Sequence, residues 1–415
     1  MSVIFDTAST SVETPVANRA GAAMRDPRLD VFRGLAMFII LVAHTPGNAW
    51  TLWIPARWGF SDSTEIFVFC SGMASAIAFG GTYARAGWAL GTARVLFRCW
   101  QVYWAHVGLF VATLALTVAL TQSGLGDTNY WGQLNLWPVF VESEKWDNAD
   151  ILLSFMTLSY VPNYFDILPM YLVVLLFLPA MVALARVSVP LAAAASVVVW
   201  LLAQDALLGT SGLAAWHLAF PAEPWTDRTW FFNPFGWQLV FFSGFALMAG
   251  WVPPPPLRRW LVALAVAVVV VNVAYSSIGV RVLGFEFARD WREANAGWFD
   301  KSSFGPLRYL QFLALAYLAW AAAGEGGRRL APRGRGTLAR IGTGLVALTT
   351  KVGQQSLAVF VFSMALARFS GFVLDVIGRN AATWALVNIG GMALLVVVAV
   401  VVGWFKGQPW RVRRP

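Results

Sequence analysis

Residues 381–405 read AATWALVNIGGMALLVVVAVVVGWF, a run without a single charged side chain. A helix needs about 20 mostly apolar residues to cross the hydrocarbon core of a bilayer, so this run is long enough to span it. The rest of the chain has a similar character. Of its 415 residues, 58% are hydrophobic and only 12% are charged, whereas soluble domains carry about 25% charged residues. The sequence therefore excludes a soluble globular enzyme and predicts an all-α, polytopic bundle of membrane helices.

Ten stretches meet the same condition of length and apolar character. The apolar run Ile151–Tyr160 is too short to be counted among them. The ten predicted spans are Gly34–Trp53, Asp62–Gly81, Val95–Thr121, Tyr164–Arg186, Ser188–Leu208, Pro234–Gly250, Trp260–Val280, Gly305–Ala323, Val352–Phe369 and Ala381–Phe405.

The distribution of basic residues predicts the orientation. If the N-terminus is inside, the inner segments hold most of the arginines and lysines, whereas the loop Gln122–Asn163 is mainly acidic. Short cytoplasmic loops are enriched in these basic residues. We therefore expect both termini in the cytoplasm. The net charge of +9 is then explained by the basic residues of the cytoplasmic loops. Since no other explanation of this charge is needed, no nucleic acid is expected as a partner.

The ends of the chain differ in composition from the spans. Residues 1–27 lack an apolar run and are rich in Ser, Thr and Ala, which predicts a disordered cytoplasmic segment. Residues 28–405 form the transmembrane domain, and residues 406–415 a basic cytoplasmic tail. The inner loop Gly324–Thr350 is rich in Gly and Arg, which predicts a flexible linker.

The first span carries the most informative polar residues. Arg33 and His44 are eleven positions apart, about three helical turns, so they share one face about 16 Å apart along the axis. Asp30 lies three residues before Arg33, which favours an ion pair at the inner end. A histidine inside a span is either a packed core residue or a functional group facing a wet cavity.

Asp62 and Glu65 lie at the start of the second span, at about the level of His44. A carboxylate beside a histidine orients the imidazole and raises its basicity, which is typical of general-base chemistry. The alternative is a helix N-cap formed by Ser61 or Asp62 with Glu65 in the first turn. Gly72 follows on the face of Glu65, where it favours close helix packing.

Several other polar residues lie at or inside spans, where each either lines a cavity or caps a helix. The three histidines and two cysteines show no metal-ligand spacing, so no metal is expected. The polar candidates for the outer side are Asp166, Trp237, Gln238, Lys301 and Arg308, with Ser356 at the start of the ninth span.

The order of these motifs resembles a known family. Arg33, ten intervening residues and His44 resemble the first-span motif of acyltransferase family 3, and Phe69–Met73 is similar to the Ser-Gly motif of its second span. The resemblance is closer to one branch, the OpgC family. The segments that resemble it are residues 25–34, 44–48, 59–62, 165–169, 233–238, 300–301 and 353–357.

This resemblance implies a bacterial inner-membrane enzyme that succinylates osmoregulated periplasmic glucans with succinyl-CoA as the donor. His44 would act as general base or accept the acyl group first, with Glu65 or Asp62 orienting its ring. One departure from the family pattern is Gln311, where a histidine is expected. The residues expected to bind the cytoplasmic acyl-CoA are Arg28, Asp30, Arg33, Ser71 and Arg98, with Arg94 and the basic residues of 328–340 also available. Those expected to bind the acceptor are Asp166, Trp237, Gln238, Lys301, Arg308 and Ser356.

Two alternatives stay open from the sequence. One is an acyltransferase for another envelope polysaccharide, and the other is a proton-coupled transporter of an anion. The sequence also leaves the oligomeric state open, with a homodimer as one option.

Overall fold

The computed structural model describes residues 26–126, 128–134, 136–141, 143–144, 146–332, 334 and 336–411. Within these ranges the chain forms helices and no β-strand, apart from two isolated bridges. The predicted all-α class is confirmed. The predicted disordered segment 1–27 lies outside the described residues except for Asp26 and Pro27, and so do the last four residues of the predicted tail.

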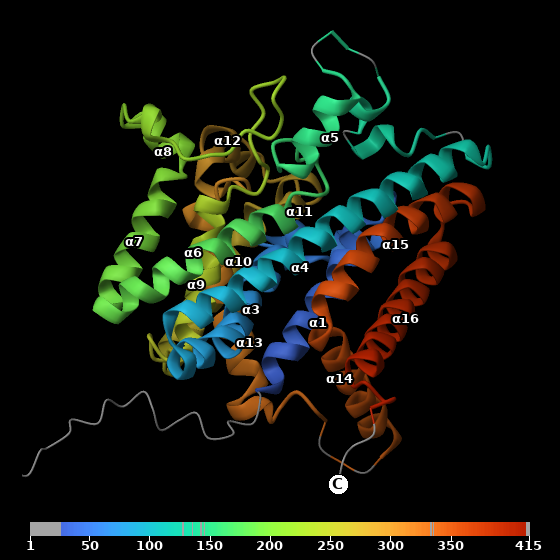
Figure 1. Cartoon of the computed structure of the whole chain (residues 1–415). Helices are drawn as coiled ribbons and strands as arrows, with labels where there is room; N and C mark the ends of the chain where they lie inside the picture. The colour runs from blue at the N-terminus through green and yellow to red at the C-terminus, as the bar shows by residue number, and fades with distance from the viewer. Residues whose placement is uncertain are drawn as a thin grey trace, which may run out of the picture.

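The long helices pack side by side, and the long α4 runs diagonally across the molecule (Figure 1). The long helices are α1 (Pro27–His44), α3 (Ser63–Ser75), α4 (Gly81–Gln122), α6 (Ile167–Val187), α7 (Val189–Leu202), α9 (Pro234–Met248), α10 (Arg259–Ala274), α13 (Pro306–Ala323), α14 (Thr337–Gln354), α15 (Ser356–Ile377) and α16 (Ala381–Lys406). The short ones are α2 (Pro55–Trp58), α5 (Asn148–Met156), α8 (Asp205–Thr210), α11 (Ser277–Arg281) and α12 (Glu286–Ala294).

Five helical segments of the described chain are long and apolar enough to cross a membrane. Two shorter apolar helices, α7 and α9, accompany them. These helices indicate a membrane protein, and the ten spans stay a prediction. The five segments are Ser63–Gln122, Ile167–Val187, Arg259–Arg281, Ser356–Ile377 and Ala381–Lys406.

Several predicted boundaries are wrong, the end of the first span and the extent of the inner linker above all; the predicted spans Ser188–Leu208 and Val352–Phe369 are also each broken by a helix end, at Leu202 and Gln354. The first span was expected to continue to Trp53, but α1 ends at His44 because Pro46 cannot donate to the helix and Gly47 adopts a left-handed φ of 68°. The expected linker Gly324–Thr350 contains most of α14. The composition of this segment concealed a helix that packs against α1, while its apolar side chains Leu338, Ile341 and Leu345 stay exposed.

Two helix pairs approach closely through glycines on both partners. A Cβ on Gly72 of α3 would collide with the backbone oxygen of Phe241 in α9, and one on Gly244 of α9 would collide with that of Phe69 in α3. The predicted close packing at Gly72 is confirmed. In the same way, Gly34 of α1 and Gly353 of α14 each face the backbone of the other helix. Small residues let membrane helices pack backbone to backbone, so α1 and α3 are held firmly.

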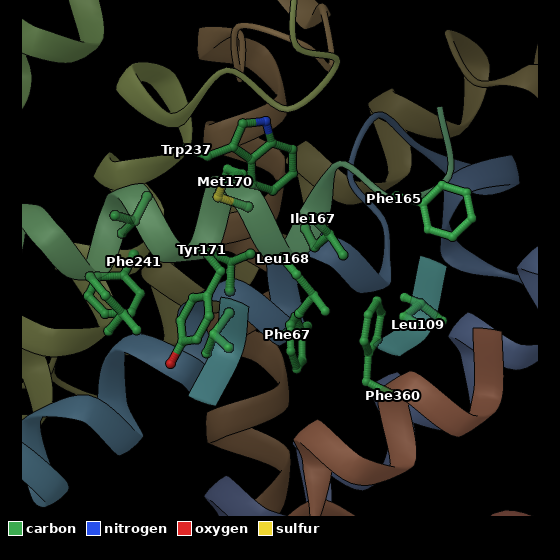
Figure 2. Close-up of a cluster of buried hydrophobic side chains, with 14 of the residues drawn as sticks. Phe67, Leu109, Phe165, Ile167, Leu168, Met170, Tyr171, Trp237, Phe241 and Phe360 are labelled. Carbon is green, nitrogen blue, oxygen red and sulfur yellow. The ribbon is translucent and has the colours of Figure 1, made fainter. Parts of the chain in front are cut away.

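The hydrophobic core lies where α3, α4, α6, α9 and α15 meet. Figure 2 shows part of it, with Phe67, Leu109, Ile167, Phe241 and Phe360 contributed by these helices. All five side chains are buried. The core therefore fills the middle of the bundle and leaves polar groups to gather above and below it.

Candidate active site

His44 is the last residue of α1, so its side chain stands where the helix stops. Its Nδ1 lies 2.8 Å from the carbonyl oxygen of Ile40. A carbonyl oxygen can only accept, so Nδ1 donates this hydrogen bond and Nε2 is the basic nitrogen of the neutral ring. The ring also meets Tyr164 edge-on, with 5.4 Å between ring centroids. These contacts fix the plane and the tautomer of the imidazole, as a general base requires.

A cavity of about 200 Å³ lies beside His44. Four polar side chains line it, from His44, Thr64, Asp166 and Lys301. Two of the residues that the sequence singled out, Asp166 and Lys301, are thus brought together with His44 from distant parts of the chain. The remaining walls are apolar or aromatic, formed by Ile40, Phe67, Tyr164, Ile167, Phe231, Phe232, Phe360 and Met364.

Asp166 has an unused carboxylate oxygen in this cavity. The residue is only 3% exposed, and its Oδ1 has no hydrogen-bond partner within the described part of the chain. It precedes α6, but its side chain makes no capping hydrogen bond, so the helix-cap alternative is wrong for Asp166. Burying a carboxylate oxygen without a partner costs free energy. The group is therefore available to a hydroxyl that enters the cavity.

Asp62 and Glu65 are each paired with a cation. Asp62 Oδ2 lies 2.5 Å from Lys301 Nζ, and Glu65 Oε1 lies 2.5 Å from Arg308 Nη1 in a buried ion pair. Asp62 also caps α3, and Glu65 completes the capping box by accepting from the Asp62 backbone N–H at 2.8 Å. The cap alternative for this pair is therefore confirmed.

The expected contact between these carboxylates and His44 is not found. Across the described residues, no hydrogen bond joins His44 to Asp62 or Glu65, and the Ile40 carbonyl fixes the ring instead. The sequence could not show this, because the cations that take the two carboxylates, Lys301 and Arg308, lie more than 230 residues further along the chain.

Gln311 of α13 fixes the loop that carries Asp62. Its Oε1 accepts hydrogen bonds from the backbone N–H groups of Phe60 and Ser61, at 2.5 and 2.6 Å. A Cβ at Gly59 would collide with the Gln311 amide, so the loop fits this side chain only with glycine there. Sequence reasoning noted Gln311 as a departure from the family pattern and missed this positioning role.

Tyr164, which lines the cavity, and Phe304, which follows Lys301 in the chain, have a strained backbone. Tyr164 has a φ of 88° and Phe304 a φ of 58°, both in the left-handed region that non-glycine residues rarely adopt. Tyr164 contacts His44, and Phe304 follows closely on Lys301. Backbone strain of this kind concentrates at functional sites, where the surrounding structure holds it in place.

A second, larger cavity of about 1000 Å³ is lined by four cationic side chains. These are Arg33, Arg94, Arg98 and Lys406. Ser356 also lines this cavity and accepts a hydrogen bond from Arg33. The prediction that Ser356 lies with the acceptor-binding residues is therefore wrong, because α15 begins at the level of Arg33 and not at the level of His44.

The other candidate residues line neither cavity. Arg28 binds Asp26 and the Gly324 carbonyl and stacks on Trp320, Asp30 accepts from Gln354, and Ser71 is buried. Trp237 donates to the Lys301 carbonyl at 2.9 Å, Gln238 is bonded to Ser196, and Arg308 is held by Glu65. These contacts give structural or positioning roles in place of the direct binding that was expected.

Apolar side chains separate the two cavities. Phe67 and Phe360 line the small cavity and stack with 5.7 Å between ring centroids, and Figure 2 shows these two rings beside each other. Leu357 and Val361, which flank Phe360 along α15, line the large cavity. The partition is therefore about one layer of side chains thick. Helix α1 runs alongside it, with Arg33 in the large cavity and His44 in the small one.

Comparison with known proteins gives one finding. The family model described as OpgC protein matches residues 25–407, nearly the whole chain. No curated protein and no solved structure matches it.

Proposed function

Because the chain belongs to the OpgC family, we propose that it is a membrane-embedded acyltransferase that moves a succinyl group from succinyl-CoA to hydroxyl groups of periplasmic glucans. The observation that carries this proposal is the arrangement along α1. Arg33 lines a large cationic cavity, and His44 lines a small, mostly apolar cavity with a few polar groups at the other end of the helix. A highly charged donor and an uncharged sugar hydroxyl need these two different environments.

The large cavity suits the donor. Its volume of about 1000 Å³ lies at the upper end of the usual range for ligand pockets, roughly 300–1,000 Å³. Arg33, Arg94 and Arg98 offer guanidinium groups for phosphates, which arginine binds through paired hydrogen bonds. Apolar residues such as Val361 and Phe362 offer a path for a neutral pantetheine arm.

In the proposed reaction, His44 Nε2 takes the proton of a sugar hydroxyl. The hydroxyl oxygen attacks the thioester carbonyl carbon, the carbon–sulfur bond breaks, and the imidazolium returns its proton to the departing thiolate. Asp166 accepts a hydrogen bond from the acceptor sugar. Lys301 has N–H donors beyond the one that Asp62 uses, so it can meet the succinyl carboxylate. A two-step route through an acyl-histidine uses the same atoms.

The proposal includes ten spans, with both termini in the cytoplasm and the protein in the bacterial inner membrane. The cationic cavity then faces the cytoplasm, where acyl-CoA is found, and the His44 cavity faces the periplasm. The basic surplus of the predicted inner loops supports this orientation, and so does the grouping of Arg94, Arg98 and Lys406 around one cavity.

Mass spectrometry of periplasmic glucans from cells lacking the protein tests this function. Complementation with wild type should restore the succinyl mass, and His44→Ala should not, although it inserts into the membrane normally. His217→Ala is the matched control, because His217 lies in a loop and lines neither cavity. Restoration by His44→Ala would remove His44 from the mechanism.

Two further outcomes separate the alternatives. An unchanged glucan profile in the deletion would contradict the glucan acceptor and leave another envelope polysaccharide. Flux of an anion into vesicles without any acyl donor, with no acyl transfer by purified protein, would favour the transporter.

A further inference from the structure

A third cavity lies where α11 meets α12, outside the site described above. Its volume is about 280 Å³, and three arginines share it. The α11 segment directly follows α10 and packs against α12, and Figure 1 shows the three helices near one another. The residues that line the cavity are Ser277, Val280, Arg281, Arg289, Arg292 and Glu293.

The three guanidinium groups have little to neutralise them. Within the described residues, Arg281 and Arg289 make no side-chain hydrogen bond and no ion pair, and Glu293 comes within ion-pair distance of none of the three. Arg292 donates to the Tyr275 carbonyl at 2.6 Å and packs over the Phe299 ring at 4.5 Å. Three arginines against the one carboxylate of Glu293 leave the cavity with a net positive charge, so an anion placed there is attracted to it.

The pKa of Arg292 agrees with this picture. Burial lowers the pKa of this guanidinium, and the nearby charges of Arg281 and Arg308 lower it further. Both of these arginines lie outside α12. The positive charge around Arg292 therefore comes from other elements as well as from its own helix. A bound anion would remove this unfavourable field.

The position of the cavity indicates where the anion comes from. The candidate membrane span Arg259–Arg281 ends at Arg281. Apolar side chains are exposed just beyond it, with Val282 66%, Leu283 52% and Phe287 59% exposed, and Glu286 beside Phe287 is exposed too. Exposed apolar side chains beside arginines at the end of a span are typical of a segment at the bilayer surface.

We propose that this cavity binds the phosphate of an anionic phospholipid headgroup at the bilayer surface. Guanidinium groups bind phosphate oxygens through charge-assisted hydrogen bonds, and Ser277 adds a hydroxyl. The acyl chains of the lipid lie along the exposed apolar residues 282, 283 and 287. The proposal does not depend on the acyltransferase reaction.

The bound lipid would also order the loop that carries Asp62, next to the His44 cavity. Arg292 lies over Phe299, and Phe299 stacks on Phe60 with 4.6 Å between centroids. Phe60 belongs to the loop that Gln311 holds and that carries Asp62. A headgroup on the arginines therefore orders the segment from which Lys301 reaches Asp62.

The full chain in phosphatidylcholine nanodiscs tests the proposal. Phosphatidylglycerol is titrated in, and native mass spectrometry counts the molecules that stay bound. Arg281→Gln with Arg289→Gln should weaken retention about fivefold for each arginine removed. Arg258→Gln with Arg259→Gln makes the same change in net charge at the other end of α10 and should weaken retention much less. Arg292 stays unchanged because its ring packing makes it a structural residue.

Three results would overturn the proposal. The first is equal loss of phosphatidylglycerol in both double variants, which would mean unspecific attraction. The second is full retention by Arg281→Gln with Arg289→Gln. The third is inorganic phosphate raising the melting temperature as much as phosphatidylglycerol does, which would assign the cavity to a soluble anion. Arg281→Lys with Arg289→Lys shows that the fold is intact, and it should retain more lipid than the glutamine pair.

Discussion

At the scale of single residues, the polar groups in and around the His44 cavity differ in whether they already have a hydrogen-bond or ion-pair partner. Asp62 and Glu65 are bound to cations and to the cap of α3. Asp166 is buried and keeps an oxygen that has no hydrogen-bond partner among the residues the structure describes. Asp166 is therefore the carboxylate whose burial costs free energy, and it is the one available to the proposed acceptor.

Asp166→Asn should lower activity and raise stability together. Asparagine keeps an acceptor oxygen, so the hydrogen bond to the acceptor loses only its charge assistance, about 1–1.5 kcal/mol, and kcat/KM should fall about fivefold to tenfold. The melting temperature should rise, because a neutral amide is less costly to bury than an unpaired carboxylate. Acyl transfer and thermal melting of the purified protein measure both. A fall in both quantities would make Asp166 a structural residue.

Lys301→Gln should weaken the preference of the protein for a charged succinyl donor over an uncharged one. With a succinyl donor, kcat/KM should fall about tenfold or more, whereas an uncharged propionyl donor should be affected much less. Asp62→Asn combined with Lys301→Gln removes the ion pair symmetrically and separates the loss of the pair from the loss of the cation. Lys351→Gln, on the exposed side of α14, is the control. An equal fall with both donors would argue against a contact with the succinyl carboxylate.

At the scale of helices, the partition between the cavities depends on one ring from α3 and one from α15. Phe67→Ala with Phe360→Ala should join the two cavities. To detect the connection, Cys70 and Cys99 are first replaced, and Met364, which lines the His44 cavity, is changed to cysteine as a reporter. A charged methanethiosulfonate reagent, added on the side of the Arg33 cavity, should label the reporter only when both rings are removed. Phe177→Ala is the control, because Phe177 lines neither cavity.

Labelling of the reporter at the same rate in all variants would show that these two rings are not the barrier. Because the measurement needs no acyl donor, it tests the partition separately from the proposed reaction.

The pairing of α3 with α9 should be sensitive to one methyl group. Gly72→Ala should lower the free energy of unfolding by about 1–3 kcal/mol, because the new Cβ meets the backbone of Phe241 and one helix must move. Gly108→Ala in α4, where a Cβ meets nothing, should leave stability unchanged or slightly higher. Thermal melting in detergent compares the two, and equal effects would contradict close contact at Gly72.

At the scale of the whole molecule, local sequence patterns predicted which residues share a helix face. They could not predict ion pairs between residues far apart in the sequence. Helical spacing placed Arg33 and His44 on one helix, and Gly72 at a close contact. The charge pairs of Asp62 and Glu65 with residues of 301–308 depend on how α13 docks, which no local pattern contains. Composition predicted a linker over 324–350 because the glycines and arginines of this segment concealed the helix α14, which docks on α1 through Gly353, just beyond the segment.

The glycine contacts that hold α1 against α14 have a consequence for the choice of donor. Since Gly34 and Gly353 leave no room between the two backbones, α1 lies firmly against α14, and about 16 Å along the helix axis separate Arg33 from His44. In the proposed reaction, a thioester with a carrier arm shorter than this distance would bind beside Arg33 without reaching His44. The fixed distance would then select donors by the length of the arm before any contact with the acyl group.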